Sequence, residues 1–291
     1  ERKYRQRRFC KRLQTLKMEE AVNMSDLIIK GGPPGKDGLV AAVSKESAGW
    51  KYVGFEVYQL QAGDTLNRSA EGNEICLVLL SGKADVRVDG QLFADIGERM
   101  SVFEDLAPYA VYVPAGGLYE VAALTELELA VCLAPGTGKY GPRLIAPSDT
   151  VAEDRGSGSM SRRVVNILPE NSEAESLLVV EVRTGGGNWS SYPPHKHDQD
   201  NLPAESYLEE TYYHRVNPAH GFVLQRVYND DRSLDEIMAV PDRSIVLVPE
   251  GYHPVSAPPG YDSYYLNVMA GPVRTWVFHN DPDHEWLFGA Q

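Results

Sequence analysis

The chain has few of the residues that would place it in a secreted, membrane or nucleic-acid-binding class. Its three cysteines are widely spaced and form no Cys-x-x-Cys pair, so free thiols in a reducing, cytoplasmic compartment are expected. No apolar run approaches the length of a membrane-spanning helix. Cations are scarce, and the formal charge of −13 argues against a nucleic-acid backbone or an anionic membrane as partner. A small anionic substrate is still compatible with this charge, because a few local arginines can dominate a site.

Cations are densest at the start of the chain. Residues 1–23 hold eight Lys or Arg against three Glu, so residues 24–291 carry −18 by subtraction from the whole-chain counts. The segment lacks the apolar run of a secretory signal and is interpreted as a basic N-terminal extension, expected to be poorly ordered. Met24 is the expected natural start, and a transit peptide is the alternative interpretation.

Long helical periodicity is also absent between Met24 and Pro135, where short apolar runs alternate with turn residues. Asp89-Gly90 between two such runs predicts a two-residue hairpin. The pattern favours an all-β sandwich or barrel. Strands are predicted at 52–60, 75–80, 84–88, 91–94, 110–113 and 127–133, and again at 177–183, 211–216, 222–228, 244–248 and 264–269.

Residues 146–161 are rich in Pro, Ser, Gly and charge and are the predicted linker between domains at 24–145 and 162–291. Two short sequence similarities relate the two halves of the chain. The stretch 112–119 resembles 247–253, each with Pro-x-Gly after an apolar strand end. Glu74 precedes its apolar run much as Glu210 precedes the next one. These echoes indicate a tandem repeat of one barrel.

Histidine is missing from the first half, and all seven histidines lie from residue 195 onward. His195 and His197 flank one lysine, and side chains two apart lie on the same face of an extended strand. A carboxylate follows at Glu210 and another imidazole at His253. Imidazole nitrogens and a carboxylate oxygen together suit a divalent first-row metal ion. The sequence therefore predicts a metal centre in the second half, with the intervening Lys196 pointing away from it.

The order His-x-His, Glu, hairpin and Pro-x-Gly-x-His is similar to the two-part motif of the cupin superfamily, whose members are small jelly-roll barrels with a metal inside. The resemblance implies an all-β bicupin of two tandem cupin domains. The domain at 24–145 looks like a degenerate, metal-free cupin, with Tyr119 near the place of a ligand histidine. The domain at 162–291 would be the metal-binding one.

Longer stretches resemble the bacterial 5-deoxy-glucuronate isomerases of myo-inositol catabolism, with the pectin-derived keto-uronate isomerases as more distant relatives. The resemblance covers residues 24–288. The stretches that carry it are 47–50, 99–104, 189–198, 207–215, 265–272 and 279–286. It implies an aldose–ketose isomerase of carbohydrate metabolism that converts 5-deoxy-D-glucuronate to 5-dehydro-2-deoxy-D-gluconate.

The resemblance also implies one divalent metal ion per chain, zinc first and manganese or iron as alternatives. His195, His197, Glu210 and His253 would hold it. The twelve-residue spacer between His197 and Glu210 is longer than the usual cupin gap, so two further carboxylates compete for the ligand role. Glu210 is preferred because it aligns with the echo of Glu74 and directly precedes a strand. The competing carboxylates are Glu205 and Glu209.

The implied reaction removes a proton from C2 of a hydroxy-aldehyde and returns one at C1, so it needs a general base. Glu209, Tyr213 and a metal-bound water are the candidates, and a metal-mediated hydride shift is the alternative. No redox cofactor is required, and the chain has no Gly-rich dinucleotide fingerprint. His214 shares a strand face with Tyr212 and Glu210 and is either a cavity or a core residue. Tyr228 and Tyr265 are further candidates for cavity hydroxyls.

The implied substrate carries a carboxylate far from its aldehyde, so a local cation must face the cavity of this acidic protein. Arg226 is the first candidate for this substrate-binding role and Arg162 the second. The alternative for Arg226 is an ion pair with Asp230 or Asp231 outside the barrel.

Two other functions compete with the isomerase. One is a cupin metal-dependent dioxygenase, and the other is a non-catalytic bicupin that binds a sugar acid. In each case the expected partner is a small anionic sugar acid, with no nucleic acid and no membrane. The sequence leaves the oligomeric state open, a homo-oligomer included.

Overall fold

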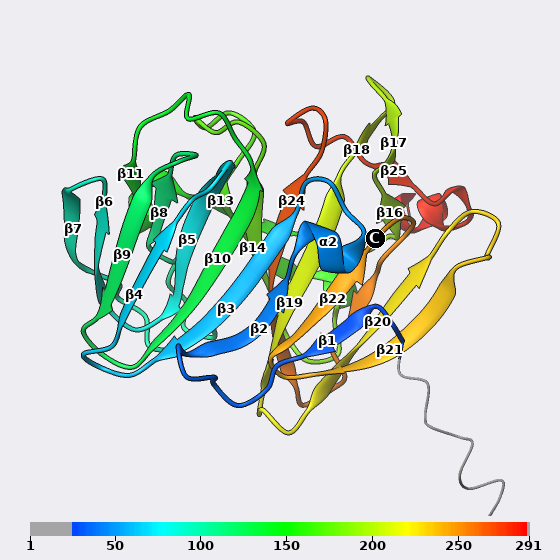
Figure 1. The fold of residues 1–291 in the computed structure, drawn as a ribbon. Helices are drawn as coiled ribbons and strands as arrows, with labels where there is room; N and C mark the ends of the chain where they lie inside the picture. The colour runs from blue at the N-terminus through cyan, green and yellow to red at the C-terminus, as the bar shows by residue number, and fades with distance from the viewer. Residues whose placement is uncertain (1–24, 290–291) are drawn as a thin grey trace, which may run out of the picture.

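The computed structural model describes residues 25–289, and the expectation for residues 1–23 falls outside this range. The described chain forms two β-sandwiches side by side, the first blue to green and the second green to red (Figure 1). Among residues 25–289 no helix combines the length and apolar character needed to cross a membrane. Of the three cysteines, Cys76 and Cys132 are described, and both are buried free thiols.

The first sandwich pairs a six-stranded antiparallel sheet with a four-stranded one. The larger sheet runs in the order β11 (Arg143–Ile145), β8 (Ala110–Val113), β5 (Asn73–Ser81), β10 (Leu127–Pro135), β3 (Gly54–Leu60), β2 (Leu39–Val43). The smaller sheet runs in the order β4 (Thr65–Ser69), β9 (Leu118–Ala123), β6 (Ala84–Val88), β7 (Gln91–Ile96). The predicted hairpin at Asp89-Gly90 is confirmed, because both residues have positive φ and join β6 to β7. One short helix, α2 (Lys45–Ala48), precedes β3.

The second sandwich pairs a seven-stranded sheet with a four-stranded one. The larger sheet runs β1 (Ile28–Lys30), β22 (Ser244–Val248), β19 (Glu209–Asn217), β24 (Asp262–Ala270), β14 (Leu178–Thr184), β13 (Arg162–Leu168), β12 (Val151–Arg155). The smaller sheet runs β15 (Trp189–Ser190), β23 (Val255–Ser256), β20 (Phe222–Tyr228), β21 (Asp235–Pro241).

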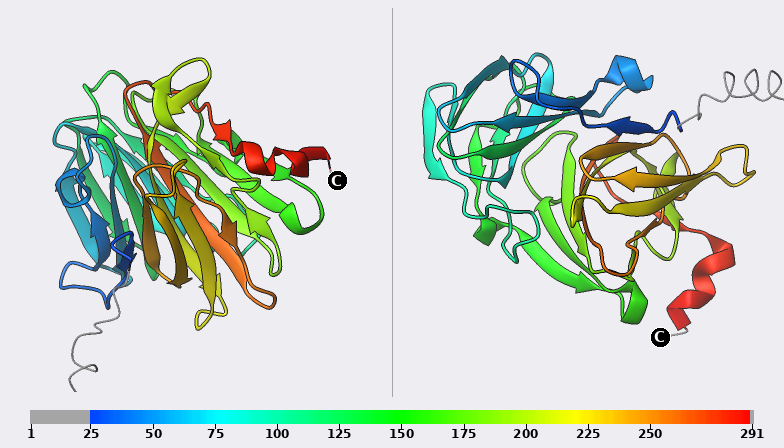
Figure 2. Two further views of the ribbon diagram at one scale, coloured as in Figure 1. Left: turned by 90° about the vertical axis from the view of Figure 1, so that its right-hand side faces the viewer. Right: turned by 90° about the horizontal axis from the view of Figure 1, so that it is seen from below.

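Two short ribbons and three 3-10 turns complete the second half. The ribbons pair β16 (His195–Lys196) with β25 (His279–Asn280), and β17 (Asp198–Asn201) with β18 (Glu205–Tyr207). The turns are η1 (Pro147–Asp149), η2 (Gly158–Met160) and η3 (Pro282–Gly289). Figure 2 shows η3, in red, at the side of the second sandwich that faces away from the first.

Two strands correct the boundaries expected from the sequence. β1 belongs by position to the first predicted domain, yet it pairs with β22 of the second sandwich. β12 lies within the predicted linker at 146–161, yet it is the edge strand beside β13. Pairing satisfies backbone groups that an irregular segment would leave to water, and local composition does not reveal a partner far along the chain.

The central strands read as continuous apolar runs because both of their faces are buried. In β5, Cys76 and Val78 pack in a core between the two large sheets, whereas Ile75 and Leu77 pack inside the first sandwich. The core between the sheets also contains Val179 and Leu266 of the second sandwich. The two sandwiches therefore pack through the outer faces of their large sheets.

Two glutamates form equivalent sets of hydrogen bonds across the interface between the two sandwiches. The carboxylate of Glu209 accepts hydrogen bonds from the backbone N–H groups of Lys51, Tyr52 and Val53 at 2.8–2.9 Å. The carboxylate of Glu74 accepts from the backbone N–H groups of three residues just before β14. Strand register shows the same equivalence, because Glu74 lies opposite Ala134 and Glu209 opposite Ala270. Glu74 therefore corresponds to Glu209, and the alignment of Glu74 with Glu210 was wrong by one residue.

Candidate metal centre

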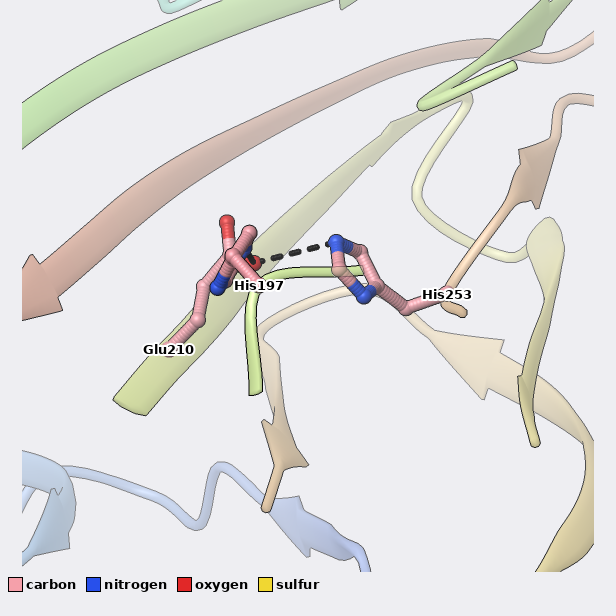
Figure 3. A group of neighbouring side chains, drawn as sticks. All are labelled: His197, Glu210 and His253. Carbon is pink, nitrogen blue, oxygen red and sulfur yellow. Dashed lines mark hydrogen bonds and ion pairs between the residues drawn. The ribbon is translucent and has the colours of Figure 1, made fainter. Parts of the chain in front are cut away.

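Three of the predicted ligands converge inside the second sandwich. The Nε2 atom of His197 lies 3.0 Å from Oε2 of Glu210, and Nε2 of His253 lies 3.2 Å from the same oxygen. All three side chains are buried, and they point toward one another in Figure 3. Their ligand atoms lie within 4.8 Å of one another. This arrangement brings two imidazoles and a carboxylate to one point.

The other nitrogen of each ring shows which atoms carry protons. Nδ1 of His197 lies 3.1 Å from the carbonyl oxygen of Leu208, and Nδ1 of His253 lies 2.8 Å from that of Gly251. A carbonyl oxygen only accepts, so we assign the ring proton to Nδ1 in both residues. Both Nε2 lone pairs then face the Glu210 carboxylate. Three electron-pair donors meeting without a donor hydrogen between them fit a divalent cation.

Burial favours the neutral imidazoles that a metal ion requires. It lowers the pKa of His253 to about 3 and that of His195 to about 3. For His197 burial acts in the same direction, but the adjacent Glu210 carboxylate and the Leu208 carbonyl together outweigh it, so the net shift raises the pKa. Nε2 of His253 has no hydrogen-bond partner among the described residues, although it lies close to Glu210. A cation between these groups would satisfy all of them.

The loops that carry the histidines are held by backbone constraints and by one buried lysine. Gly251 has φ of +84°, and a Cβ there would lie 2.3 Å from the carbonyl oxygen of Tyr228, so only glycine fits before His253. The Lys196 ammonium points away from the cluster, as predicted, and lies 2.9 Å from Asp198. The other carboxylate oxygen of Asp198 accepts from the backbone N–H of Gly251. Asp198, paired with Lys196, thereby links the His-x-His segment to the His253 loop.

His195 lies beside this cluster rather than within it. Its ring centroid is 5.0 Å from that of His253 and 6.4 Å from that of His197, and it packs against Phe278 at 4.7 Å. Its side chain lines the same cavity as Glu210. The structure therefore groups three predicted ligands closely and places the fourth at their edge.

A cavity of about 610 Å³, counting its open mouth, extends from the cluster across the sandwich. Hydroxyl groups line it beside Glu210: Oγ of Ser191 lies 2.9 Å from the hydroxyl oxygen of Tyr212 and 3.4 Å from that of Tyr265. Burial raises the pKa of both tyrosines, so both keep their protons at neutral pH. Ser191 has φ of +47°, a strained backbone conformation that positions its hydroxyl between them.

Arg162, the second candidate for the substrate-binding role, lines the cavity at the other side. Its Nη1 donates to the carbonyl oxygen of Met160 at 3.0 Å, and it forms no ion pair with any described carboxylate. Burial lowers its pKa. Its neighbour Arg155 also lines the cavity but is bound to Glu153. Arg162 is thus a half-buried cation without an acidic partner.

Three candidate residues lie elsewhere, and these predictions were wrong. Glu209 is no general base, because its carboxylate is bound to backbone N–H groups at the interface. Tyr213 faces the same interface, and its hydroxyl donates to Glu128 at 2.6 Å. Arg226 forms an ion pair with Asp235 on the outer surface, at 2.7 Å. Strand alternation explains the first two, because residues at odd positions of β19 point away from the cavity.

The structure also settles two alternatives that the sequence left open, Glu205 as a ligand and His214 as a cavity or core residue. Glu205 accepts from the backbone N–H groups of Asp198 and Gln199, so it is not near the ligand atoms. His214 is a core residue, with Nε2 lying 2.8 Å from Oε1 of Gln225. Sequence reasoning missed Ser191, Tyr212 and Asn267 as cavity residues, and named Tyr265 only among several tyrosines. Alternation from Glu210 could have identified Tyr212.

Two tandem jelly-roll sandwiches, one with inward-facing histidines and a glutamate, define the class of bicupins. Over residues 27–287 the sequence matches the KduI/IolB family. It is 64% identical over 268 residues to the 5-deoxy-glucuronate isomerase of Geobacillus kaustophilus, covering 92% of this chain and 97% of that one. The corresponding isomerase of Listeria monocytogenes is 52% identical over 251 residues, covering 86% and 92%. The chain belongs to the KduI/IolB family.

Solved structures agree with this assignment. An IolB-like protein from Salmonella typhimurium LT2 superposes with a TM-score of 0.88 at 51% identity, covering 91% of this chain and 100% of that one. The oxalate decarboxylase of Lactobacillus farciminis superposes with a TM-score of 0.63 at 13% identity, covering 92% of each chain. The second similarity concerns the fold alone, and it extends across both sandwiches.

Proposed function

We propose that this protein is a 5-deoxy-glucuronate isomerase, which converts 5-deoxy-D-glucuronate to 5-dehydro-2-deoxy-D-gluconate in myo-inositol catabolism. One observation carries the proposal. A single cavity has metal-type ligands at one end and, at the other, an arginine that forms no ion pair within residues 25–289, in a chain whose relatives carry this name. The substrate has a hydroxy-aldehyde at one end and a carboxylate at the other, which matches these two ends.

The metal would be one divalent ion per chain, zinc first and manganese or iron as alternatives. His197, Glu210 and His253 already point to one place, and His195 would complete the set from the adjacent cavity wall. When bound, such an ion polarises a carbonyl oxygen and stabilises negative charge that develops on it. The burial of the imidazoles and the contacts of both Nδ1 atoms with carbonyl oxygens, which direct Nε2 toward Glu210, support this assignment.

Arg162 would bind the substrate carboxylate and thereby orient the reacting carbons. A planar guanidinium holds a carboxylate through two parallel hydrogen bonds, and this one has no competing acidic partner. The overall negative charge of the protein makes such a local cation necessary. Tyr212 and Tyr265, which keep their protons, would donate hydrogen bonds to substrate oxygens near the ligand cluster.

Proton NMR of the purified protein with 5-deoxy-D-glucuronate in deuterated water, without oxygen, tests the proposal. An isomerase forms the ketose, and solvent deuterium at C1 reports a proton-transfer route. A product that carries no deuterium indicates a hydride shift instead. A dioxygenase gives no product until oxygen is added, and a binding protein gives none under either condition, so either result would reject the isomerase.

A further inference from the structure

On the inner face of the seven-stranded sheet, the side chains change from polar to apolar between the ligand cluster and Arg162. Register aligns Tyr212 of β19 with Asn267 of β24, and Asn267 with Val180 of β14. The next row aligns Tyr265 of β24 with Val182 of β14. The face is therefore polar on β19 and β24 and apolar on β14.

The apolar part continues to β13 and ends at the arginine. Val182 lies opposite Val164, and Arg162 is two residues before Val164 on the same strand face. The three valines all line the cavity and are each at most 6% exposed. They form a valine belt, Val164, Val180 and Val182, between the hydroxyl-lined wall and the cation.

The order of groups along the proposed substrate follows the same sequence. From C1 to C6 it has an aldehyde, three hydroxyl-bearing carbons, one methylene at C5 and a carboxylate. Three strand spacings, about 14 Å, separate the backbones of β19 and β13. Glu210 and Arg162 reach into this width from its two sides. A six-carbon acid bound between the cluster and Arg162 has its C5 next to the guanidinium, beside the valines.

We propose that the valine belt determines specificity for the missing hydroxyl at C5. This inference rests on the proposed function and concerns the substrate class that the same site accepts. A 5-hydroxyl placed against three buried valine side chains loses its hydrogen bonds to water and gains none. D-glucuronate, which has that hydroxyl and the same charge and chain length, would therefore be rejected. The methylene of the 5-deoxy compound leaves no polar group unpaired.

Binding of two unreactive acids tests the belt without turnover. Borohydride reduction of 5-deoxy-D-glucuronate and of D-glucuronate gives two open-chain acids that differ only at C5 and neither isomerise nor close to a pyranose. Calorimetry on the metal-loaded protein measures both dissociation constants. The wild type is expected to bind the deoxy acid roughly 10- to 100-fold more tightly, the range for a hydroxyl placed in an apolar pocket.

Isosteric substitutions then show which valines cause the preference for the deoxy acid. A hydroxyl partner is supplied by each of three substitutions, Val180→Thr, Val182→Thr and Val164→Thr. In at least one of them the ratio of the two dissociation constants should fall about 10-fold. Val179→Thr is the matched control, because Val179 lies on β14 but faces the core between the sandwiches. That variant should keep the wild-type ratio even if its unfolding midpoint drops.

The outcomes separate this inference from the proposed function. A wild-type ratio near one, or an unchanged ratio in all three belt variants at full metal content, would overturn the belt even if the protein isomerises 5-deoxy-D-glucuronate. The proposed role of the valine belt is supported if the wild type strongly prefers the deoxy acid and the belt variants lose this preference. If the same wild type fails to isomerise the aldehyde, only the proposed reaction is rejected.

Discussion

The two sandwiches share a strand plan but differ in what fills them. Equivalent positions of β5 and β19 point inward, as the pairing of Glu74 with Ala134 and of Glu209 with Ala270 establishes. In β5 these positions hold Ile75, Leu77 and Leu79, and in β19 they hold Glu210, Tyr212 and His214. The first set packs in an apolar core, whereas Glu210 and Tyr212 of the second set border a cavity, with Glu210 in the ligand cluster, and His214 is a buried polar core residue.

The comparison shows which part of a repeated fold is free to change. The outer faces of both large sheets join the sandwiches. At this interface Glu209 and Glu74 accept equivalent hydrogen bonds from backbone N–H groups. The interior of the first sandwich is filled mainly by aliphatic side chains, and such close packing stabilises the fold. The interior of the other can then hold polar groups that contribute to function at some cost in packing. The ligand cluster and the cavity beside it therefore both lie in the second sandwich.

The largest expected effect is the loss of the metal centre in Glu210→Ala. Removing the only carboxylate in the cluster should lower metal affinity and activity together by more than about 100-fold, since even outer partners of metal ligands matter 10- to 100-fold. Elemental analysis and the isomerase assay measure both. Ile75→Ala is the matched control in the first sandwich, and it should lose roughly 2–5 kcal/mol of stability but no metal. Full metal occupancy in Glu210→Ala would reject Glu210 as a ligand.

The next largest effect distinguishes the two arginines. Arg162→Ala should keep its fold and metal but lose roughly 2–4 kcal/mol in kcat/KM, because a desolvated contact to the substrate carboxylate is removed. Arg226→Ala removes an ion pair with Asp235 and a cation–π contact with Tyr228, both outside the cavity, and should stay near wild type. Steady-state kinetics on both variants decide the matter. Normal kcat/KM in Arg162→Ala would show that another group binds the carboxylate.

A third prediction concerns the interface. Glu209→Ala and Glu74→Ala each leave three backbone N–H groups without their acceptor, and each should lower the free energy of unfolding by about 3 kcal/mol. Chemical denaturation measures the loss. Activity per folded molecule should persist in Glu209→Ala, because this carboxylate does not face the cavity. Loss of activity in fully folded Glu209→Ala would restore its role as a base.

The smallest effect is a pH dependence located in the second sandwich. Burial lowers the pKa of His214 to about 4, so the folded state keeps it neutral while the unfolded chain is protonated below about 6.5. The unfolded state then binds more protons, and stability falls as pH drops from about 6.5 to 4. His214→Gln should show a shallower decline than the wild type in denaturation at several pH values. Parallel curves for the two proteins would contradict this assignment.

Much of the fold followed from sequence because alternation and turn residues act locally. The predicted strands at 84–88, 110–113, 222–228 and 244–248 match β6, β8, β20 and β22 residue for residue. β1 and β12 were assigned to the wrong segments, because their partners lie far along the chain or in a stretch with linker composition. Pairing between distant strands depends on tertiary contacts that a window of residues does not contain.

The sequence predicted three of the metal ligands correctly but misplaced several other residues of the candidate site. His197, Glu210 and His253 come together as expected, although the argument from the Glu74 echo selected Glu210 for the wrong reason. Strand period two, applied from Glu210, would have excluded Glu209 as well as Tyr213 from the cavity. Arg226 lies on the predicted strand, but it was expected to face the cavity and instead faces outward, because the sequence does not show which face of β20 is buried.

A crystal structure of the metal-loaded protein, with anomalous data collected at the absorption edge of the bound metal, tests the central claim most directly. The account predicts one anomalous peak per chain, about 2.0–2.2 Å from Nε2 of His197, Nε2 of His253 and an oxygen of Glu210. His195 should turn to supply the fourth protein ligand. A peak inside the first sandwich, or full loading with no peak at the Glu210 cluster, would contradict it.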